Sequence, residues 1–391
     1  PSPQPQAQTQ SGAQSPAPVV DGPAGTPEGT APVELAPVGA AESLQDPQAQ
    51  DSGGFLSIPG TRGKEHVSSQ IELETRAKAV AADPRVTIDT EKLKGSLRLK
   101  GARIDDIILA EHTESIEEGS TLVHLLNPQG SMQPYYVDFG WIVDPSSAAK
   151  IELPGGNTVW TPDASTLTVG QPVTLSWNNG TGQTFRMKIN VDENYLFTVE
   201  QSVENAGSSA ITLLPYGRVS RLRTPATTGF YILHEGPLGV FNEVLEEVDY
   251  SDLVEDSREA FAKTGQARRT ARTFESKGGW LGITDKYWLA ALIPDQKSNI
   301  KATINHSADP RVLGVDEDYM MLGAHRYQTD FLGEPVEIAP GQTAGSTNNA
   351  YIGEKRLSLL DEYETQLGVT HFDLAIGFGW FYFLTKPIFL A

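Results

Sequence analysis

The chain has 391 residues, a formal net charge of −20 at pH 7 and 39% hydrophobic residues. It contains no cysteine, which excludes a disulfide framework. The negative charge argues against a protein that wraps nucleic acid, so we expect no nucleic-acid partner. The length fits two average domains, or one large β domain with tails. The chain begins at Pro1 without a methionine, so we expect either a removed leader or a piece of a longer protein.

Residues 1–64 are expected to form a disordered tether. The first 60 residues are rich in Pro, Gln, Ala, Gly, Ser and Thr, and Phe55 is their only aromatic residue. Such a composition buries too little apolar surface to offset the entropy of the chain. Sixty flexible residues span roughly 40–45 Å, enough to hold a domain away from an anchor. The alternative is an extended strand docked on the domain that follows.

From Glu65 onward we expect strands, because apolar and polar residues alternate. In Gln183–Val191 (QTFRMKINV) every second residue from Phe185 is apolar, and Phe197, Val199 and Val203 alternate in the same way after a turn. This pattern predicts a hairpin with one buried face. Similar short runs, separated by Pro, Gly and Asn, continue along the chain. The region 65–346 is therefore predicted to be one all-β domain, a large two-sheet sandwich.

Two segments carry helical features. Asn242–Lys263 is dense in Asp and Glu, so we expect an exposed excursion with a short helix around Val244, Leu245 and Val248. Residues 347–370 are expected to form a helical linker. Its predicted helix is Tyr351–Leu367, with Leu357, Leu360, Tyr363 and Leu367 at helical spacing and Gly368 as the stop.

The last segment, residues 371–391, is predicted to lie on a membrane surface. From Leu374 onward its one charged residue is Lys386. The 12 residues from Trp380 to Ala391 give about 18 Å of helix, too short for a hydrocarbon core of about 30 Å. Aromatic residues favour the boundary between lipid tails and water. The predicted contact residues are Trp380, Phe381, Tyr382, Phe383, Lys386 and Phe389. The alternatives are an element tucked into the core and the entry to a longer hydrophobic element.

Local clusters give weak indications of chemistry. His234-Glu235 follows an apolar run and could supply one member of an acid/base pair. Asp316-Glu317-Asp318 could bind a divalent cation but lacks the glycine and closing glutamate of a calcium loop. The basic run Arg268–Arg272 could pair with the acidic segment before it or with a partner, but a solvated strand edge is the simpler interpretation. We expect no catalytic residue, metal or cofactor, since ordinary turns and strand ends explain these clusters.

Several stretches resemble a known family. They are Arg85–Thr90 (RVTIDT), Val203–Gly207 (VENAG), Ser276–Trp280 (SKGGW) and, above all, His371–Pro387 (HFDLAIGFGWFYFLTKP). Together with the order of tether, sandwich, helix and aromatic segment, they resemble the periplasmic region of the YidC-type membrane protein insertases of Gram-negative bacteria. The resemblance covers roughly residues 65–391. It implies a β-supersandwich similar to sugar mutarotases, without enzymatic activity, on the periplasmic side of the inner membrane.

The resemblance also implies partners. They are the lipid surface of the inner membrane, nascent membrane proteins, and the Sec translocon with SecD and SecF. It places the first transmembrane helix before Pro1 and the insertase core after Ala391. The alternative hypothesis is a carbohydrate-binding or mutarotase-like periplasmic protein. That function requires a cleft with convergent polar groups, and its candidate lining residues are Trp141, Trp160, Trp177 and Trp288.

Overall fold

The computed structural model describes residues 61–145, 151–227, 233–309, 313 and 325–377. All of them lie in the compact unit Pro37–Ala391. Three α-helices are defined there: α1 (Thr61–Ala81), α2 (Tyr250–Thr264) and α4 (Leu357–Leu367), followed by the 3-10 helix η2 (Phe372–Ala375). Among these described helices, none combines the length and the apolar character needed to cross a bilayer.

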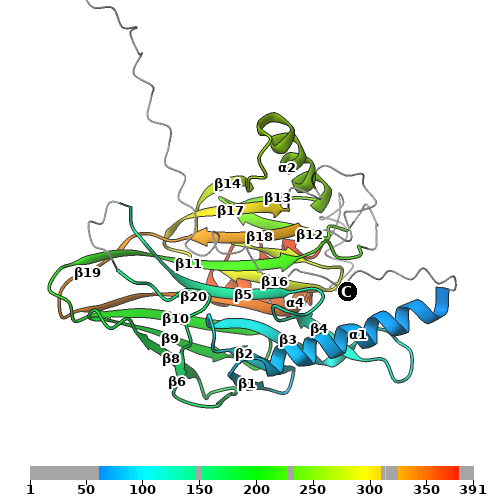
Figure 1. The fold of residues 1–391 in the computed structure, drawn as a ribbon, viewed down its shortest axis with the longest axis horizontal. Coiled ribbons are helices and arrows are strands. Elements are labelled where there is room, and N and C mark those ends of the chain that lie inside the picture. The colour runs from blue at the N-terminus through cyan, green and yellow to red at the C-terminus, as the bar shows by residue number, and fades with distance from the viewer. Residues whose placement is uncertain (1–60, 146–150, 228–232, 310–312, 314–324, 378–391) are drawn as a thin grey trace, which may run out of the picture. The chain divides into compact units, whose positions relative to one another are not determined.

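Most of the described chain forms two β-sheets, which confirms the predicted all-β sandwich (Figure 1). The large sheet contains β1 (Arg85–Asp89), β2 (Leu93–Arg98), β3 (Arg103–Thr113), β4 (Leu122–Leu126), β5 (Tyr135–Val143), β7 (Thr166–Leu167), β11 (Ile211–Leu222), β14 (Thr270–Lys277), β17 (Asn299–Ala308), β18 (His325–Leu332) and β19 (Val336–Ile338). The small sheet contains β6 (Thr161–Pro162), β8 (Val173–Asn178), β9 (Gln183–Val191), β10 (Leu196–Asn205), β12 (Gly236–Phe241), β13 (Val244–Glu247), β15 (Trp280–Thr284), β16 (Trp288–Ile293) and β20 (Thr343–Glu354).

Strand order shows that segments distant in sequence form each sheet. The large sheet runs β14-β17-β18-β11-β5-β3-β2-β1-β7, with β19 paired to β11 and β4 paired to β3. The small sheet runs β13-β12-β15-β16-β20-β10-β9-β8-β6. Except for the parallel pair β1–β7, the strand pairings of both paths are antiparallel.

The predicted hairpin is β9 and β10. Val191 pairs with Phe197 and Phe185 pairs with Val203, so the apolar sets of both strands share one face. The side chains of Phe185, Met187, Ile189 and Val191 are at most 2% exposed. They belong to the core between the sheets, which Tyr135 crosses by donating its hydroxyl proton to the Ile283 carbonyl at 3.1 Å. The alternation of side chains along a strand explains this agreement.

The first described segment differs from the prediction. Residues 61–81 form α1, although strands were expected from Glu65 onward. Its Glu, Lys, Arg and Ala residues are good helix formers, and Pro84 disfavours helix at the residue before it, which accounts for the end at Ala81. Arg76 holds the helix to the large sheet through an ion pair with Asp106 and a 3.0 Å hydrogen bond from Nε to Asn127 Oδ1.

The acidic excursion contains a helix, but at a later position than predicted. Val244 and Leu245 lie in strand β13, and α2 begins at Tyr250. Tyr250, Leu253 and Val254 are buried, so this face of α2 packs against the domain and is not fully solvent-exposed. The apolar run in the β13 segment, Val244-Leu245, is too short to separate strand from helix by periodicity.

The boundary at residue 346 is also displaced. Strand β20 continues to Glu354, where it pairs with Trp288 of β16, so the sheet includes residues expected in the helical linker. Helix α4 begins at Leu357 and keeps the predicted buried positions Leu360 and Tyr363. Gly368 ends it with a φ of 66°, as predicted.

Candidate functional site

The C-terminal junction is the part of the described fold that leads toward the aromatic segment. After Gly368, Val369 is buried and the chain turns at His371, whose φ is 56°. Phe372 opens η2 and is completely buried. A left-handed backbone at a non-glycine residue is uncommon and requires support from its surroundings. The junction therefore depends on the contacts that hold it.

Aromatic side chains supply the first of these contacts. Phe372 meets the ring of Trp280 at 5.3 Å and the ring of Tyr351 at 5.5 Å, both nearly perpendicular. Tyr363 of α4 meets Tyr351 at 5.7 Å in a similar arrangement. Edge-to-face pairs at these distances are favourable beyond the area that they bury. The packing fixes η2 and α4 on the small sheet.

Hydrogen bonds complete the junction. The Trp280 indole N–H donates to the His371 carbonyl at 3.2 Å, and the Phe372 amide donates to Glu364 Oε2 at 2.9 Å. The Tyr363 hydroxyl donates to a carboxylate oxygen of Asp192. Burial, followed by the Asp192 carboxylate, raises the pKa of Tyr363 above its usual value. The phenol therefore stays protonated and remains a donor at neutral pH.

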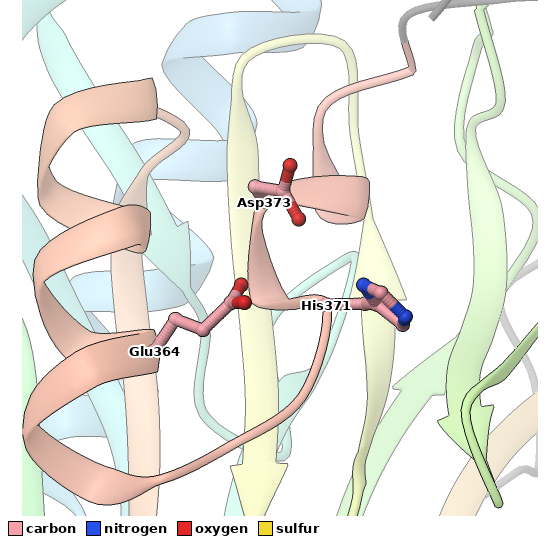
Figure 2. A group of neighbouring side chains, drawn as sticks. All are labelled: Glu364, His371 and Asp373. Atoms are coloured by element: carbon pink, nitrogen blue, oxygen red, sulfur yellow. The ribbon is translucent and has the colours of Figure 1, made fainter. Parts of the chain in front are cut away.

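Figure 2 shows the polar group of this junction, Glu364, His371 and Asp373. One potential ligand atom from each lies within 4.8 Å of the others, which would suit a divalent cation. Glu364 already accepts the Phe372 amide, however, and Asp373 is 1% exposed and has a polar partner of its own. The group therefore fits a structural role in the turn. This group was not predicted from the sequence, although His371 and Asp373 lie within the quoted HFD stretch.

The predicted membrane-contact residues are Trp380, Phe381, Tyr382, Phe383, Lys386 and Phe389. All of them lie outside the described residues, as does Asp316-Glu317-Asp318. The membrane contact of the first group and the expected absence of a metal at the second therefore stay predictions. The described chain brings the segment only as far as Gly377, two residues beyond η2.

The four tryptophans of the alternative hypothesis are not equivalent. Trp141 and Trp160 are 3% and 5% exposed and belong to the core, so they cannot form the wall of an open cleft. Trp177 is partly buried against Phe185, at 5.7 Å between ring centroids. Trp288 lines a cavity of about 410 Å³ beside α1 and β4. Of the four, Trp288 thus lies at a cavity of ligand size.

The other sequence clusters have structural partners. His234 Nε2 lies 3.0 Å from the Pro237 carbonyl and Nδ1 lies 3.4 Å from Asp249, so both ring nitrogens have local partners. Arg272 pairs with Asp256 of α2 at 3.0 Å, which confirms pairing of the basic run with the acidic segment. Arg269 lies 3.4 Å from Asp330 of β18. These contacts explain both clusters without catalysis.

Solved structures with a related arrangement have low similarity scores. A galactose mutarotase-like protein from Lactobacillus casei has 10% sequence identity and a TM-score of 0.35, covering 68% of this chain and 99% of that chain. A GH36 alpha-galactosidase, AgaB from Geobacillus stearothermophilus, has 9% identity and a TM-score of 0.34, covering 69% and 40%. Similarity at this level carries no conclusion about function.

Proteins related by sequence are much more similar to this chain than these solved structures are. A protein named membrane protein insertase YidC from Methylobacterium nodulans is 43% identical over 345 residues, covering 88% of this chain and 53% of the relative. A protein of the same name from Acidiphilium cryptum is 44% identical over 316 residues, covering 81% and 50%. The chain thus spans about half the length of these relatives. The family model described as the YidC periplasmic domain matches residues 85–391. The chain therefore belongs to the YidC periplasmic domain family.

Proposed function

We propose that this chain is the periplasmic part of a membrane protein insertase that helps inner-membrane proteins insert and fold. The observation that carries the proposal is the 43% identity to a relative named membrane protein insertase YidC, over 88% of this chain. The proposed activity belongs to the whole protein, of which this chain corresponds to about half. The chain itself contributes a folded body without catalysis.

The proposed location is the periplasmic face of the inner membrane. Phe372, Asp373 and Ala375 are buried in the domain, so the lipid-contacting part of the predicted segment 371–391 would begin after η2. Trp380, Phe381, Tyr382, Phe383, Lys386 and Phe389 would contact the lipid surface. The buried Phe372 and the Trp280–His371 hydrogen bond support this arrangement, because they hold the start of the segment against the domain. The proposed partners are nascent membrane proteins and the Sec translocon with SecD and SecF.

A chimera tests the function. Residues 85–391 would replace the matching half of the Methylobacterium nodulans relative, in cells depleted of their own insertase. We expect restored growth and restored insertion of a reporter membrane protein, measured by protease protection. A control chimera carrying Gly353→Ala, which would place a Cβ 2.2 Å from the Tyr195 ring, should restore less. A folded, membrane-localised chimera without insertion activity would contradict the proposal.

Vesicle co-sedimentation tests the membrane contact separately. The full chain should sediment with bilayer vesicles, and a variant that ends at Gly379 should not. Four large side chains buried at about 1.5 kcal/mol each supply roughly 6 kcal/mol, enough for measurable binding. Equal sedimentation of both proteins, or none of either, would remove lipid contact from the proposal.

A further inference from the structure

A cluster of arginines surrounds Tyr136 on the outer face of the large sheet. Tyr135 faces the core, since its hydroxyl donates to Ile283 of the small sheet. Successive side chains of a strand point to opposite faces, so Tyr136 and Asp138 point away from the core. Strands β3, β5, β11 and β18 lie side by side in this sheet (Figure 1). Register pairs Asp138 with both Arg103 and Arg218, which therefore share the same outer face.

Three guanidinium groups converge on the tyrosine. The guanidinium carbons of Arg103 and Arg218 lie 4.6 Å and 5.9 Å from the centre of the Tyr136 ring. Arg326 of β18 donates from Nη1 to the Tyr136 hydroxyl at 3.4 Å. Tyr136, Arg103 and Arg218 are buried, whereas Arg326 is only half-buried and gives the cluster access to solvent.

The carboxylates beside these arginines carry less negative charge than the arginines carry positive charge. Arg218 uses both oxygens of Asp138, at 2.9 Å and 2.5 Å, and Arg103 Nε lies 3.4 Å from one of the same oxygens. Arg103 Nε, in a side chain that is 9% exposed in total, has no hydrogen-bond partner of proper geometry within the described residues. Arg103 and Arg218 thus share one carboxylate, and Arg326 brings a third positive charge to the Tyr136 hydroxyl. The neighbouring Asp330 is occupied by Gln328, Asn305 and Arg269.

The excess of positive charge affects the pKa of Tyr136. Burial alone would raise the pKa of a phenol, but Arg218, Arg103 and Arg326 together lower the pKa of Tyr136 below its usual value. A buried positive potential of this kind is costly unless an anion neutralises it. The hydroxyl of Tyr136 accepts from Arg326, so its own proton is available to an incoming acceptor.

We propose that Tyr136, Arg103 and Arg326 form a binding site for an oxyanion, a phosphate or phosphodiester group, on the outer face of the large sheet. Arg326 supplies N–H donors from the solvent side, Arg103 supplies its unpartnered Nε–H, and Tyr136 donates its hydroxyl proton. Arg218 remains paired with Asp138 and holds that carboxylate away from the ligand. Guanidinium donors match the geometry of phosphate oxygens. The proposal does not depend on the insertase function.

Calorimetric titration of the full chain with inorganic phosphate tests the site, at constant ionic strength maintained with chloride. We expect saturable binding of one phosphate with a Kd of about 10 mM or tighter. Arg326→Gln should weaken binding about tenfold, in the range of a lost charge-assisted hydrogen bond. Tyr136→Phe should also weaken it. Arg268→Gln is the matched control, because it removes the same charge from an exposed arginine elsewhere.

A second readout separates binding from a structural role. Phosphate should raise the pKa of Tyr136, seen as an upward shift of one phenol in the ultraviolet titration that is missing in Tyr136→Phe. Glycerophosphoglycerol, the soluble headgroup of an anionic lipid, identifies the source. Arg326-dependent binding of this diester would indicate a lipid headgroup, and binding of inorganic phosphate alone would indicate a free phosphate. Either result supports the site. Absence of saturable binding, or equal affinities of Arg326→Gln and Arg268→Gln, would overturn it.

Discussion

Trp280 and His371, 91 residues apart in sequence, are joined by a 3.2 Å hydrogen bond from the indole N–H to the backbone carbonyl. The same indole packs against Phe372, the residue after His371. Trp280 closes the SKGGW stretch and His371 opens the HFD stretch, so two of the stretches that resemble the family meet at this contact. The contact fixes the start of the C-terminal segment against β15.

Phe372→Ala should loosen this junction. The side chain is completely buried among Trp280 and Tyr351, so its removal leaves a cavity and should cost about 3–5 kcal/mol in the free energy of unfolding. Urea unfolding followed by tryptophan fluorescence measures the cost. Leu374→Ala, at a partly exposed position of η2, is the control and should cost less. Equal losses in both variants would contradict the assigned role of Phe372.

The ion pair between Asp138 and Arg218 should be sensitive to removal of one partner. Asp138→Asn leaves Arg103 and Arg218 buried beside a neutral amide, which should cost about 3–5 kcal/mol of stability. The exposed pair Lys188–Glu200 on the small sheet is the comparison, and Glu200→Gln should cost less than about 1 kcal/mol. Urea unfolding of the two variants gives the difference. A small loss in Asp138→Asn would show that the arginines are well hydrated.

Parts of this structure were accessible from the sequence, and other parts were not. The sequence predicted the β9–β10 hairpin correctly, because a two-residue period with one buried face specifies both strands. Helix α1 was predicted as part of the strand region, although its Glu, Lys, Arg and Ala residues favour a helix. The arginine cluster could not be found, because Arg218 and Asp138 are 80 residues apart and meet only through strand pairing. For the same reason, the four tryptophans proposed for one cleft are distributed between the core and the surface.

Two glycines near the C-terminus should respond differently to substitution. At Gly368 an added Cβ would meet no atom within 4 Å, so the only penalty of Gly368→Ala comes from the φ of 66°. We expect it to lower the free energy of unfolding by about 1 kcal/mol. At Gly353 the Cβ would lie 2.2 Å from the Tyr195 ring, so Gly353→Ala forces a buried side chain to move. We expect a larger loss there, about 1–3 kcal/mol. Thermal unfolding compares them, and the reverse order would contradict the packing around Tyr195.

Stability should fall in mild acid because of a buried histidine pair. His306 of β17 and His325 of β18 are joined at 3.0 Å, and Ser257 of α2 contacts His306 Nδ1 at 2.7 Å. Burial, followed by His325, lowers the pKa of His306 to about 3, and burial followed by Arg258 lowers that of His325. The unfolded chain therefore binds more protons between pH 6.5 and about 3, so stability is lost as the pH falls through this window.

His306 alone should account for about 2 kcal/mol between pH 7 and pH 5. The other polar groups that face the pair are Thr270, bonded to Ser257, and Tyr327, which contacts both rings. Urea unfolding across this range should show a steeper decline for the natural sequence than for His306→Gln, which keeps a polar side chain but cannot bind a proton. Since α2 reaches the pair through Ser257, hydrogen exchange at pH 5 should rise first in α2. Parallel pH profiles of the two proteins would remove the pair as the cause.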